Sequence, residues 1–564
     1  MAKTVSIGAQ DFSRIRERDC FYIDKSYFIR DWWDSQDEVT LITRPRRFGK
    51  TLNMSMLECF FSNKYENRSD LFEGLSVWED ERYRALQGTY PVIFMSFAGV
   101  KGDNYEDTVK GIKKQIVKTF SDFSVLRTYE EFDPNEKAAL AKISEEMSDV
   151  DAEYSINLLT TLLEKYYHKK ALIFLDEYDT PLQEAYVHGY WDKLVVFTRA
   201  MFNNTFKTNP SMERAVMTGI TRVSKESIFS DLNNLNVVTT TSDEYATCFG
   251  FTEKEVFAAM DEQGIPENEK KNVKAWYDGF TFGQVTDIYN PWSVTSYLSK
   301  KKYDTYWANT SGNGLVSKLI REGDKGIKTE FEKLLKGECI EAKIDEEIIF
   351  SQLSGNRNAI WSLLLASGYL KVDRIIQEHT NDDPVYQLAL TNFEVKKMFI
   401  KMVQDWFAQT EDFGEFVNAM FNGAEDAMND YMNEVALNTF SYFDSGKDRA
   451  GRRHPERFYH GFVLGLMVDK ADSYMVKSNR ESGYGRYDVV MEPKDTKNVA
   501  VIMEFKVLNQ KAGEESLEDT AANALKQVEE KKYDADLLQR GIPVEHILKY
   551  GFAFEGEKCL IKKA

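Results

Sequence analysis

Short apolar runs alternate with longer stretches of helical spacing through the first half of the chain. The clearest runs are EVTLIT at 38–43, YPVIFMSFAG at 90–99, ALIFLDE at 171–177 and RAVMTG at 214–219. Strands that alternate with helices favour a parallel sheet with crossover helices on its faces. We therefore predict an α/β domain with a parallel sheet over residues 1–245.

The pattern changes twice in the second half of the chain. From residue 249 it becomes mainly helical, which predicts a helical lid subdomain over residues 246–334 and a helical linker region over residues 335–444. After residue 445 the pattern indicates a helix, two strands, a helix and a final strand. We therefore predict a second α/β domain over residues 445–564.

Composition narrows the class of protein. With 564 residues the chain is too long to form a single domain with one hydrophobic core, because domains hold roughly 100–200 residues. The 5 cysteines form no C-x-x-C pair, and no apolar stretch approaches the roughly 20 residues of a membrane helix. We expect a cytoplasmic protein without a membrane partner. A net charge of −19 disfavours general attraction to nucleic acid, but allows local basic channels at 44–47 and 446–457.

A strand-to-helix junction at TRPRRFGKTL carries the first candidate site. Gly49 allows close backbone approach to a phosphate, Lys50 reaches the β and γ phosphates, and Thr51 is placed to ligate Mg²⁺. Arg44 stands where a phosphate loop normally has its first glycine, and Pro45 can stiffen the turn instead. The alternative interpretation is a chance G-K-T at the start of a helix.

Acidic residues at the end of a later strand strengthen the nucleotide interpretation. The run ALIFLDEYD ends in Asp176 and Glu177, which we predict to be the magnesium-side and water-activating carboxylates. Asp179 is interpreted as a helix cap. Thr218 is predicted to sense the γ phosphate, and Arg222 to act as a sensor or arginine finger, with a plain surface arginine as an equal alternative.

These motifs resemble a family of bacterial and archaeal AAA-type ATPase-like proteins whose phosphate loop reads RPRRFGK[ST]. The resemblance spans roughly the first 330 residues, and within it Arg44 in place of glycine is normal. It implies bound ATP and Mg²⁺, with Arg44 and Arg47 among the nucleotide-binding residues. ATP turnover, as opposed to a slow ATP switch, stays open. The matching stretches are YIDKS at 22–26, RPRRFGKTL at 44–52, LIFLDEYDTPL at 172–182, TGITRVSKESIFSDLNNL at 218–235, FGFTEKEV at 249–256, WYDGF at 276–280 and YNPWSV at 289–294.

The second candidate site lies near the C-terminus, in two predicted strands joined by a turn. This hairpin would bring Asp488 close to Glu504, and the two-residue period places Glu504 and Lys506 on one face while Phe505 faces the core. Two carboxylates and an ammonium suit metal-dependent phosphodiester hydrolysis. Asp488 and Glu504 would hold the metal, and Lys506 would orient the attacking water. The alternative is an ordinary hairpin with a surface ion pair.

This region resembles the PD-(D/E)XK nuclease superfamily over about 120 residues. The resemblance implies a metal-dependent nuclease that uses Mg²⁺ or Mn²⁺. Glu456 would supply a further carboxylate, Gln527 would contact water or phosphate, and His460 is interpreted as structural. The residues in the order of the motif are Glu456, Asp488, Glu504, Lys506, Gln527 and Tyr533.

Taken together, the motifs favour an ATP-regulated nuclease acting on nucleic acid, with DNA favoured over RNA. Related architectures imply a setting in defence against foreign DNA. The alternative is a nucleotide-dependent switch or scaffold whose nuclease-like domain binds nucleic acid or a protein without cutting. A helicase or remodeller is disfavoured because the sequence shows no helicase motif set. Oligomerisation stays open, because Arg222 alone does not establish an arginine finger supplied between subunits.

Overall fold

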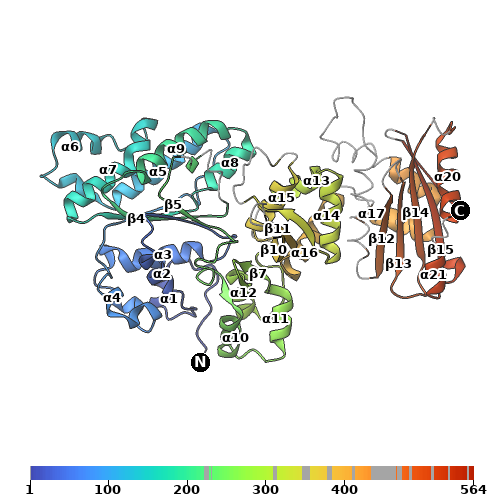
Figure 1. Ribbon diagram of the computed structural model, residues 1–564, viewed down its shortest axis with the longest axis horizontal. Helices are drawn as coiled ribbons and strands as arrows, with labels where there is room; N and C mark the ends of the chain where they lie inside the picture. The colour runs from blue at the N-terminus through green and yellow to red at the C-terminus, as the bar shows by residue number, and fades with distance from the viewer. Residues whose placement is uncertain are drawn as a thin grey trace. The chain divides into compact units, whose positions relative to one another are not determined.

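A computed structural model gives the fold of both halves of the chain (Figure 1). The described residues divide into two compact units, Met1–Gly312 with Cys339–Lys396, and Asn313–Glu338 with Lys397–Ala564. The boundaries of the four domains inferred from the sequence stay a prediction. The structure describes residues 2–221, 228–229, 231–308, 314–345, 353, 356–377, 384–408, 413–433, 465, 470, 473–481, 486–509, 513–530, 534–555 and 558–564.

The first unit is organised around a parallel sheet of strand order β2-β3-β4-β1-β5. The predicted parallel sheet is therefore confirmed, although β5 was not anticipated. Because β4 lies between β1 and β3, the carboxyl ends of these strands meet at one edge of the sheet. The strands are β1 (Val39–Thr43), β2 (Val92–Ser96), β3 (Ala171–Asp176), β4 (Met212–Gly219) and β5 (Leu235–Val238).

Helices cover both faces of this sheet, which explains why β1 and β3 are buried along their whole length. In Figure 1, α1, α2 and α3 lie on one face, and α5, α7 and α9 lie on the other. On the first face Trp32 packs edge-on against Phe61 and Phe174. The helices up to the lid are α1 (Phe12–Glu17), α2 (Tyr27–Ser35), α3 (Lys50–Phe61), α4 (Glu81–Arg84), α5 (Tyr105–Ser121), α6 (Pro134–Ala141), α7 (Asp149–Tyr167), α8 (Thr180–His188) and α9 (Trp191–Phe206).

The rest of the first unit holds helices α10, α11 and α12 of the region predicted as a lid, helix α15, and two antiparallel sheets, ordered β6-β8-β7 and β10-β11-β9. We predicted helices alone for residues 335–444, and the strands β9 to β11 correct this. They are short, and β9 buries every second residue. The elements are β6 (Phe251–Thr252), α10 (Glu253–Glu262), α11 (Glu269–Tyr277), β7 (Phe280–Phe282), β8 (Val285–Tyr289), α12 (Pro291–Lys300), β9 (Ile340–Lys343), α15 (Arg357–Ala366), β10 (Leu370–Gln377) and β11 (Val385–Leu390).

The second unit contains a mixed sheet of order β12-β13-β14-β15-β16, in which β14 and β15 pair in parallel and the other pairs are antiparallel. The segment predicted as one final strand is the hairpin β15–β16, and β12 was not predicted. Helix α20 connects β14 to β15. The elements are α13 (Gly314–Glu322), α14 (Lys325–Lys336), α16 (Phe393–Ala408), α17 (Phe413–Asn422), β12 (Tyr474–Glu481), β13 (Arg486–Pro493), β14 (Ala500–Val507), α20 (Leu517–Glu530), α21 (Ala535–Gln539), β15 (Ile547–Glu555) and β16 (Lys558–Lys563).

The predicted α/β fold class is confirmed: a parallel sheet at the N-terminus, helices in the middle and a mixed sheet at the C-terminus. Within the described ranges, no helix combines the length and apolar character needed to cross a bilayer.

Candidate nucleotide and nuclease sites

The loop between β1 and α3 has the backbone of a phosphate-binding turn. Gly49 precedes the first residue of α3 and has φ 79°, a left-handed value that glycine adopts without strain. A Cβ atom at Gly49 would meet nothing within 4 Å, so the backbone conformation and not crowding requires glycine here. The free N–H groups of the first turn of α3 therefore face the position where phosphate oxygens bind in such loops.

Arg44 is a structural residue in this loop. Its side chain is fully buried and donates hydrogen bonds to the carbonyls of Thr43, Thr239 and Glu244 at 3.0, 2.5 and 3.2 Å. Its guanidinium lies 4.5 Å from the centroid of the Phe282 ring, and burial lowers its pKa to about 10. We expected Arg44 to bind the nucleotide, but its hydrogen-bonding groups point into the protein and brace the loop.

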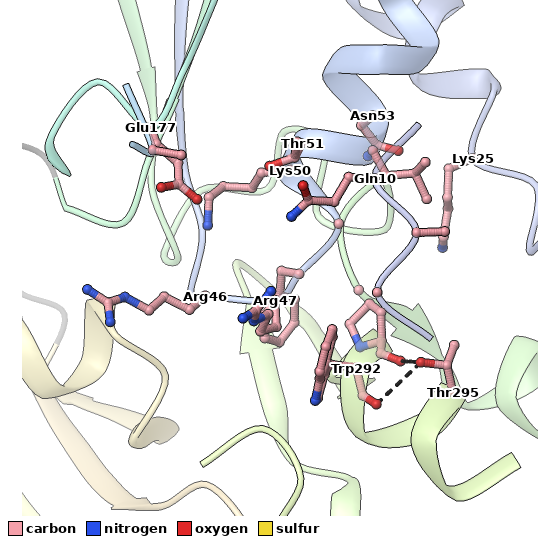
Figure 2. Close-up of a pocket in the computed structure, with 18 of the residues that line it drawn as sticks. Gln10, Lys25, Arg46, Arg47, Lys50, Thr51, Asn53, Glu177, Trp292 and Thr295 are labelled. Atoms are coloured by element: carbon pink, nitrogen blue, oxygen red, sulfur yellow. Dashed lines mark hydrogen bonds between the residues drawn. The ribbon is translucent and has the colours of Figure 1, made fainter. Parts of the chain in front are cut away.

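Lys50 is also buried, and its ammonium is held by the loop itself. The Nζ atom donates to the carbonyl oxygens of Arg44 and Pro45, each at 2.8 Å. Burial lowers the pKa of Lys50 to about 8, although the nearby carboxylates of Glu177 and Asp176 oppose the shift. Figure 2 shows the amine directed towards Glu177 within the same pocket.

A buried carboxylate joins the ends of strands β3 and β4 to the start of helix α3. Asp176, fully buried at the end of β3, accepts a hydrogen bond from the hydroxyl of Thr51 at 2.8 Å and from that of Thr218 at 2.5 Å. The structure thus brings together the predicted magnesium-side carboxylate, the predicted metal-ligating hydroxyl and the predicted sensor threonine. A carboxylate and a hydroxyl in contact form an all-oxygen donor set that suits Mg²⁺.

Glu177 takes an unusual backbone conformation beside this network. Its φ is 52°, in the left-handed region that residues other than glycine rarely adopt. Its carboxylate accepts a hydrogen bond from the hydroxyl of Thr180 at 3.2 Å, and the residue is half-buried at the wall of the cavity. Such strain concentrates at functional sites. The Glu177 carboxylate therefore lies near the Lys50 amine, and both residues line the cavity.

A cavity of about 370 Å³ extends from the phosphate loop towards the N-terminal segment and α12. Arg47 lines it, has φ 66° and stacks its guanidinium 4.4 Å from the centroid of Trp292 (Figure 2). Gln10 and Lys25 also line the cavity. In the sequence, Lys25 and Trp292 were visible only as parts of the family stretches YIDKS and YNPWSV, which assigned them no role. Gln10 carried no signal.

Two nucleotide-site expectations have other outcomes. Asp179 precedes the first residue of α8, but its side chain caps none of the N–H groups of that helix, so the predicted capping role is wrong. Its carboxylate instead accepts hydrogen bonds from the backbone N–H groups of Ile220 and Thr221. Arg222 lies outside the described residues.

The C-terminal hairpin has the predicted register. Asp488 on β13 pairs directly with Glu504 on β14, and directly opposed residues share one face of a sheet. Phe505 is buried on the other face and stacks on Phe552 with centroids 4.5 Å apart. Positions 488, 504 and 506 therefore lie on one face of the sheet by register.

Helix α20 supplies the partners of Glu504 and Lys506. Glu504 is fully buried, and its carboxylate accepts a hydrogen bond from the Gln527 side-chain amide. The Lys506 ammonium donates to the carbonyl of Asn523 at 3.1 Å. We had expected Gln527 to contact water or phosphate, but its side-chain amide donates a hydrogen bond to Glu504. Glu456, His460 and Tyr533 lie outside the described residues, as does the side chain of Asp488.

Glu514 is a residue near this site that the sequence did not single out. Its carboxylate accepts hydrogen bonds from the side chains of Thr520 and Asn523 at 2.8 and 2.9 Å, and from the N–H of Asn509 at 2.8 Å. Burial opposes the ionised form, but these hydrogen bonds hold the pKa of Glu514 below its usual value. Glu514 therefore fixes Asn523, whose carbonyl holds Lys506.

Comparisons with known proteins support the assignment of both domains. Residues 6–229 match the family described as "Predicted AAA-ATPase", and residues 454–564 match the PD-(D/E)XK nuclease superfamily. The resemblance inferred from the motifs is thus confirmed for both regions, although the first match ends at residue 229, short of the roughly 330 residues that we inferred. An uncharacterized protein from the vnfD 5' region of Azotobacter chroococcum mcd 1 is 23% identical over 565 residues, which cover 98% of this chain and 96% of the relative.

Replacing Arg44 by glycine, the residue usual at this position in phosphate loops, should destabilise the protein without improving nucleotide binding. The change removes three hydrogen bonds from a buried cation and leaves carbonyls unsatisfied, which should cost about 3 kcal/mol of unfolding free energy. Urea unfolding measures this cost. Arg46→Gly is the matched control, because Arg46 is exposed in the same loop. Equal stability of the two variants would contradict the bracing role.

Affinity for ATP should fall as pH rises above about 8, the pKa of Lys50 in the free protein. Phosphate oxygens favour the ammonium, so binding above that pH must take up a proton at Lys50. The affinity should decrease by up to about tenfold per pH unit. Calorimetry at pH 7 to 9.5 tests this, with Lys50→Arg as the control that stays charged throughout. Parallel pH profiles for the two proteins would count against the prediction.

Proposed function

We propose that this protein is an ATP-regulated, metal-dependent nuclease that acts on DNA. The observation that supports it best is the convergence of Lys50, Thr51, Asp176 and Glu177 at one edge of the first sheet, beside a cavity. The same chain holds Asp488 and Glu504 in register on one face of a second sheet. Because one chain holds both sites, the nucleotide site could regulate the nuclease site.

In the nucleotide site, each side chain has a separate task. Thr51 and Asp176 would hold Mg²⁺, which neutralises phosphate charge when bound. Lys50 would leave the loop carbonyls for the β and γ phosphate oxygens, which are stronger acceptors because they are charged. Glu177 would polarise the attacking water, and the hydroxyl of Thr180 holds its carboxylate through a hydrogen bond. Thr218 would sense the γ phosphate, and its hydroxyl donates a hydrogen bond to Asp176.

In the nuclease site, Asp488 and Glu504 would hold Mg²⁺ or Mn²⁺, which stabilises the developing charge on a phosphodiester. Gln527 fixes the orientation of the Glu504 carboxylate through its hydrogen bond. Lys506, half-buried beside it, would orient the attacking water and stabilise the hydroxide. Glu456 is the further carboxylate that the superfamily pattern places here. A cellular setting in defence against foreign DNA belongs to this proposal.

A second candidate is a nucleotide-dependent scaffold whose nuclease-like domain binds without cutting. The observation in its favour is the complete burial of Glu504, because a carboxylate covered by α20 is closed to solvent. The two candidates differ in a direct way. Cutting requires metal to reach Glu504, whereas binding through the surface of the same domain does not.

Metal-dependent cleavage should depend on Glu504. Labelled single- and double-stranded DNA and RNA are incubated with Mg²⁺ or Mn²⁺, with and without ATP. Glu504→Ala should abolish cleavage, and Lys506→Ala should keep metal binding but lose most of the rate, since the lysine acts on the water. Manganese binding, followed by electron paramagnetic resonance, separates these effects.

Glu555→Ala is the matched control, because Glu555 is an exposed glutamate at the end of β15 in the same sheet. It should cut like the wild type. Undiminished cleavage by Glu504→Ala would refute the nuclease site. If no substrate is cut in any nucleotide state, the scaffold becomes the better account.

A further inference from the structure

The carboxylate of Asp179 is fully buried and caps none of the backbone N–H groups of its own helix. Its Oδ2 atom accepts hydrogen bonds from the N–H groups of Ile220 and Thr221 at 2.9 and 3.0 Å, and from the hydroxyl of Thr221 at 3.1 Å. The side-chain amide of Gln183 donates to the same oxygen at 2.9 Å. One carboxylate oxygen thus receives donors from the segment after β4 and from α8.

The segment that Asp179 holds is part of the nucleotide site. It follows directly from Thr218, whose hydroxyl donates to Asp176, and Ile220 lines the cavity beside the phosphate loop. Because β4 lies between β1 and β3, a shift of this segment would move Thr218 relative to Asp176. Asp179 lies three residues after Asp176, so it links the end of β3, which carries Asp176, to the end of β4, which carries Thr218.

Neighbouring contacts complete the link between these two segments. The backbone N–H of Tyr178 donates to the carbonyl of Thr218 at 3.0 Å, and its hydroxyl donates to the carbonyl of Thr221 at 2.8 Å. Gly219 leaves room for this approach, because a Cβ atom there would lie 2.6 Å from the Tyr178 ring and 3.0 Å from Asp179 Oδ1. Two consecutive N–H groups that converge on one oxygen form an anion-binding concavity, so a carboxylate suits this place.

We propose that Asp179 is a positioning residue for ATP hydrolysis, which clamps residues 219–221 so that Thr218, Asp176 and Glu177 keep their alignment with Lys50. The inference rests on the proposed ATPase function. Asp179 contacts the protein and not the nucleotide. ATP binding, which depends on α3 and Lys50, should therefore survive its removal, while turnover should not.

The test separates binding from turnover. Affinity is measured by calorimetry with a non-hydrolysable ATP analogue, and kcat by phosphate release. Asp179→Ala should leave the affinity within about threefold and lower kcat at least about tenfold, since a misplacement of 1 Å can cost about 100-fold. Asp179→Asn keeps an oxygen that can accept both N–H groups, so its kcat should stay within about threefold of the wild type. Gly219→Ala should lower kcat as Asp179→Ala does, because it forces the same segments apart.

Controls make each outcome decisive. Asp133→Ala removes an exposed helix-capping aspartate of the same unit and should leave kcat unchanged. Glu177→Gln marks the rate expected when the chemistry itself is lost. If Asp179→Ala does not fold, Thr221→Val replaces it in the test. This variant removes one donor to Asp179 and should lower kcat by less than Asp179→Ala would.

Wild-type kcat in Asp179→Ala or in Thr221→Val would overturn the proposal, as would an equal loss of affinity and kcat. An Asn variant as slow as the Ala variant would also overturn it, because the acceptor geometry would then not matter. These results leave the ATPase itself intact. A wild-type protein that binds ATP without hydrolysing it would overturn both this inference and the proposed turnover.

Discussion

The buried carboxylate of Asp176 is the contact on which the nucleotide site depends. It accepts hydrogen bonds from Thr51 at the start of α3 and from Thr218 near the end of β4, so it fixes the end of β3 with respect to the end of β4 and the start of α3. A fully buried carboxylate is costly unless donors or a cation satisfy it. The same requirement that stabilises the fold therefore places oxygen ligands where a magnesium ion would bind.

The arginine that replaces glycine in the phosphate loop obeys a related constraint. A loop that lacks the first glycine needs another way to hold its entry, and Arg44 provides it through carbonyls on the β1 end and on the segment after β5. Glycine is kept at position 49, where φ is 79°. The Arg44 side chain thus holds the start of the loop, while the N-terminus of α3 stays open. The Lys50 ammonium donates hydrogen bonds to the carbonyls of Arg44 and Pro45 at the start of the loop.

The sequence was informative where the determinants are local and less so where they are distant. The positions of Lys50 at the start of α3 and of Asp176 and Glu177 at the end of β3 followed from motifs of a few residues, and the register of Asp488 with Glu504 followed from a short hairpin. The role of Arg44 did not, because its partners Thr239 and Glu244 lie 195 and 200 positions away. Asp179 has the local pattern of a helix cap, yet backbone donors 41 and 42 positions away compete successfully for its carboxylate.

The proposed control of DNA cleavage by the nucleotide site can be measured directly. The most direct measurement is the initial rate of cleavage of labelled DNA in Mg²⁺, with and without ATP, for the wild type and for Lys50→Ala. ATP should change the wild-type rate and leave the rate of Lys50→Ala unchanged, because the lysine is the point charge that the loop offers to the β and γ phosphates. Equal rates for both proteins, unaffected by ATP although the wild type binds it, would contradict the claim.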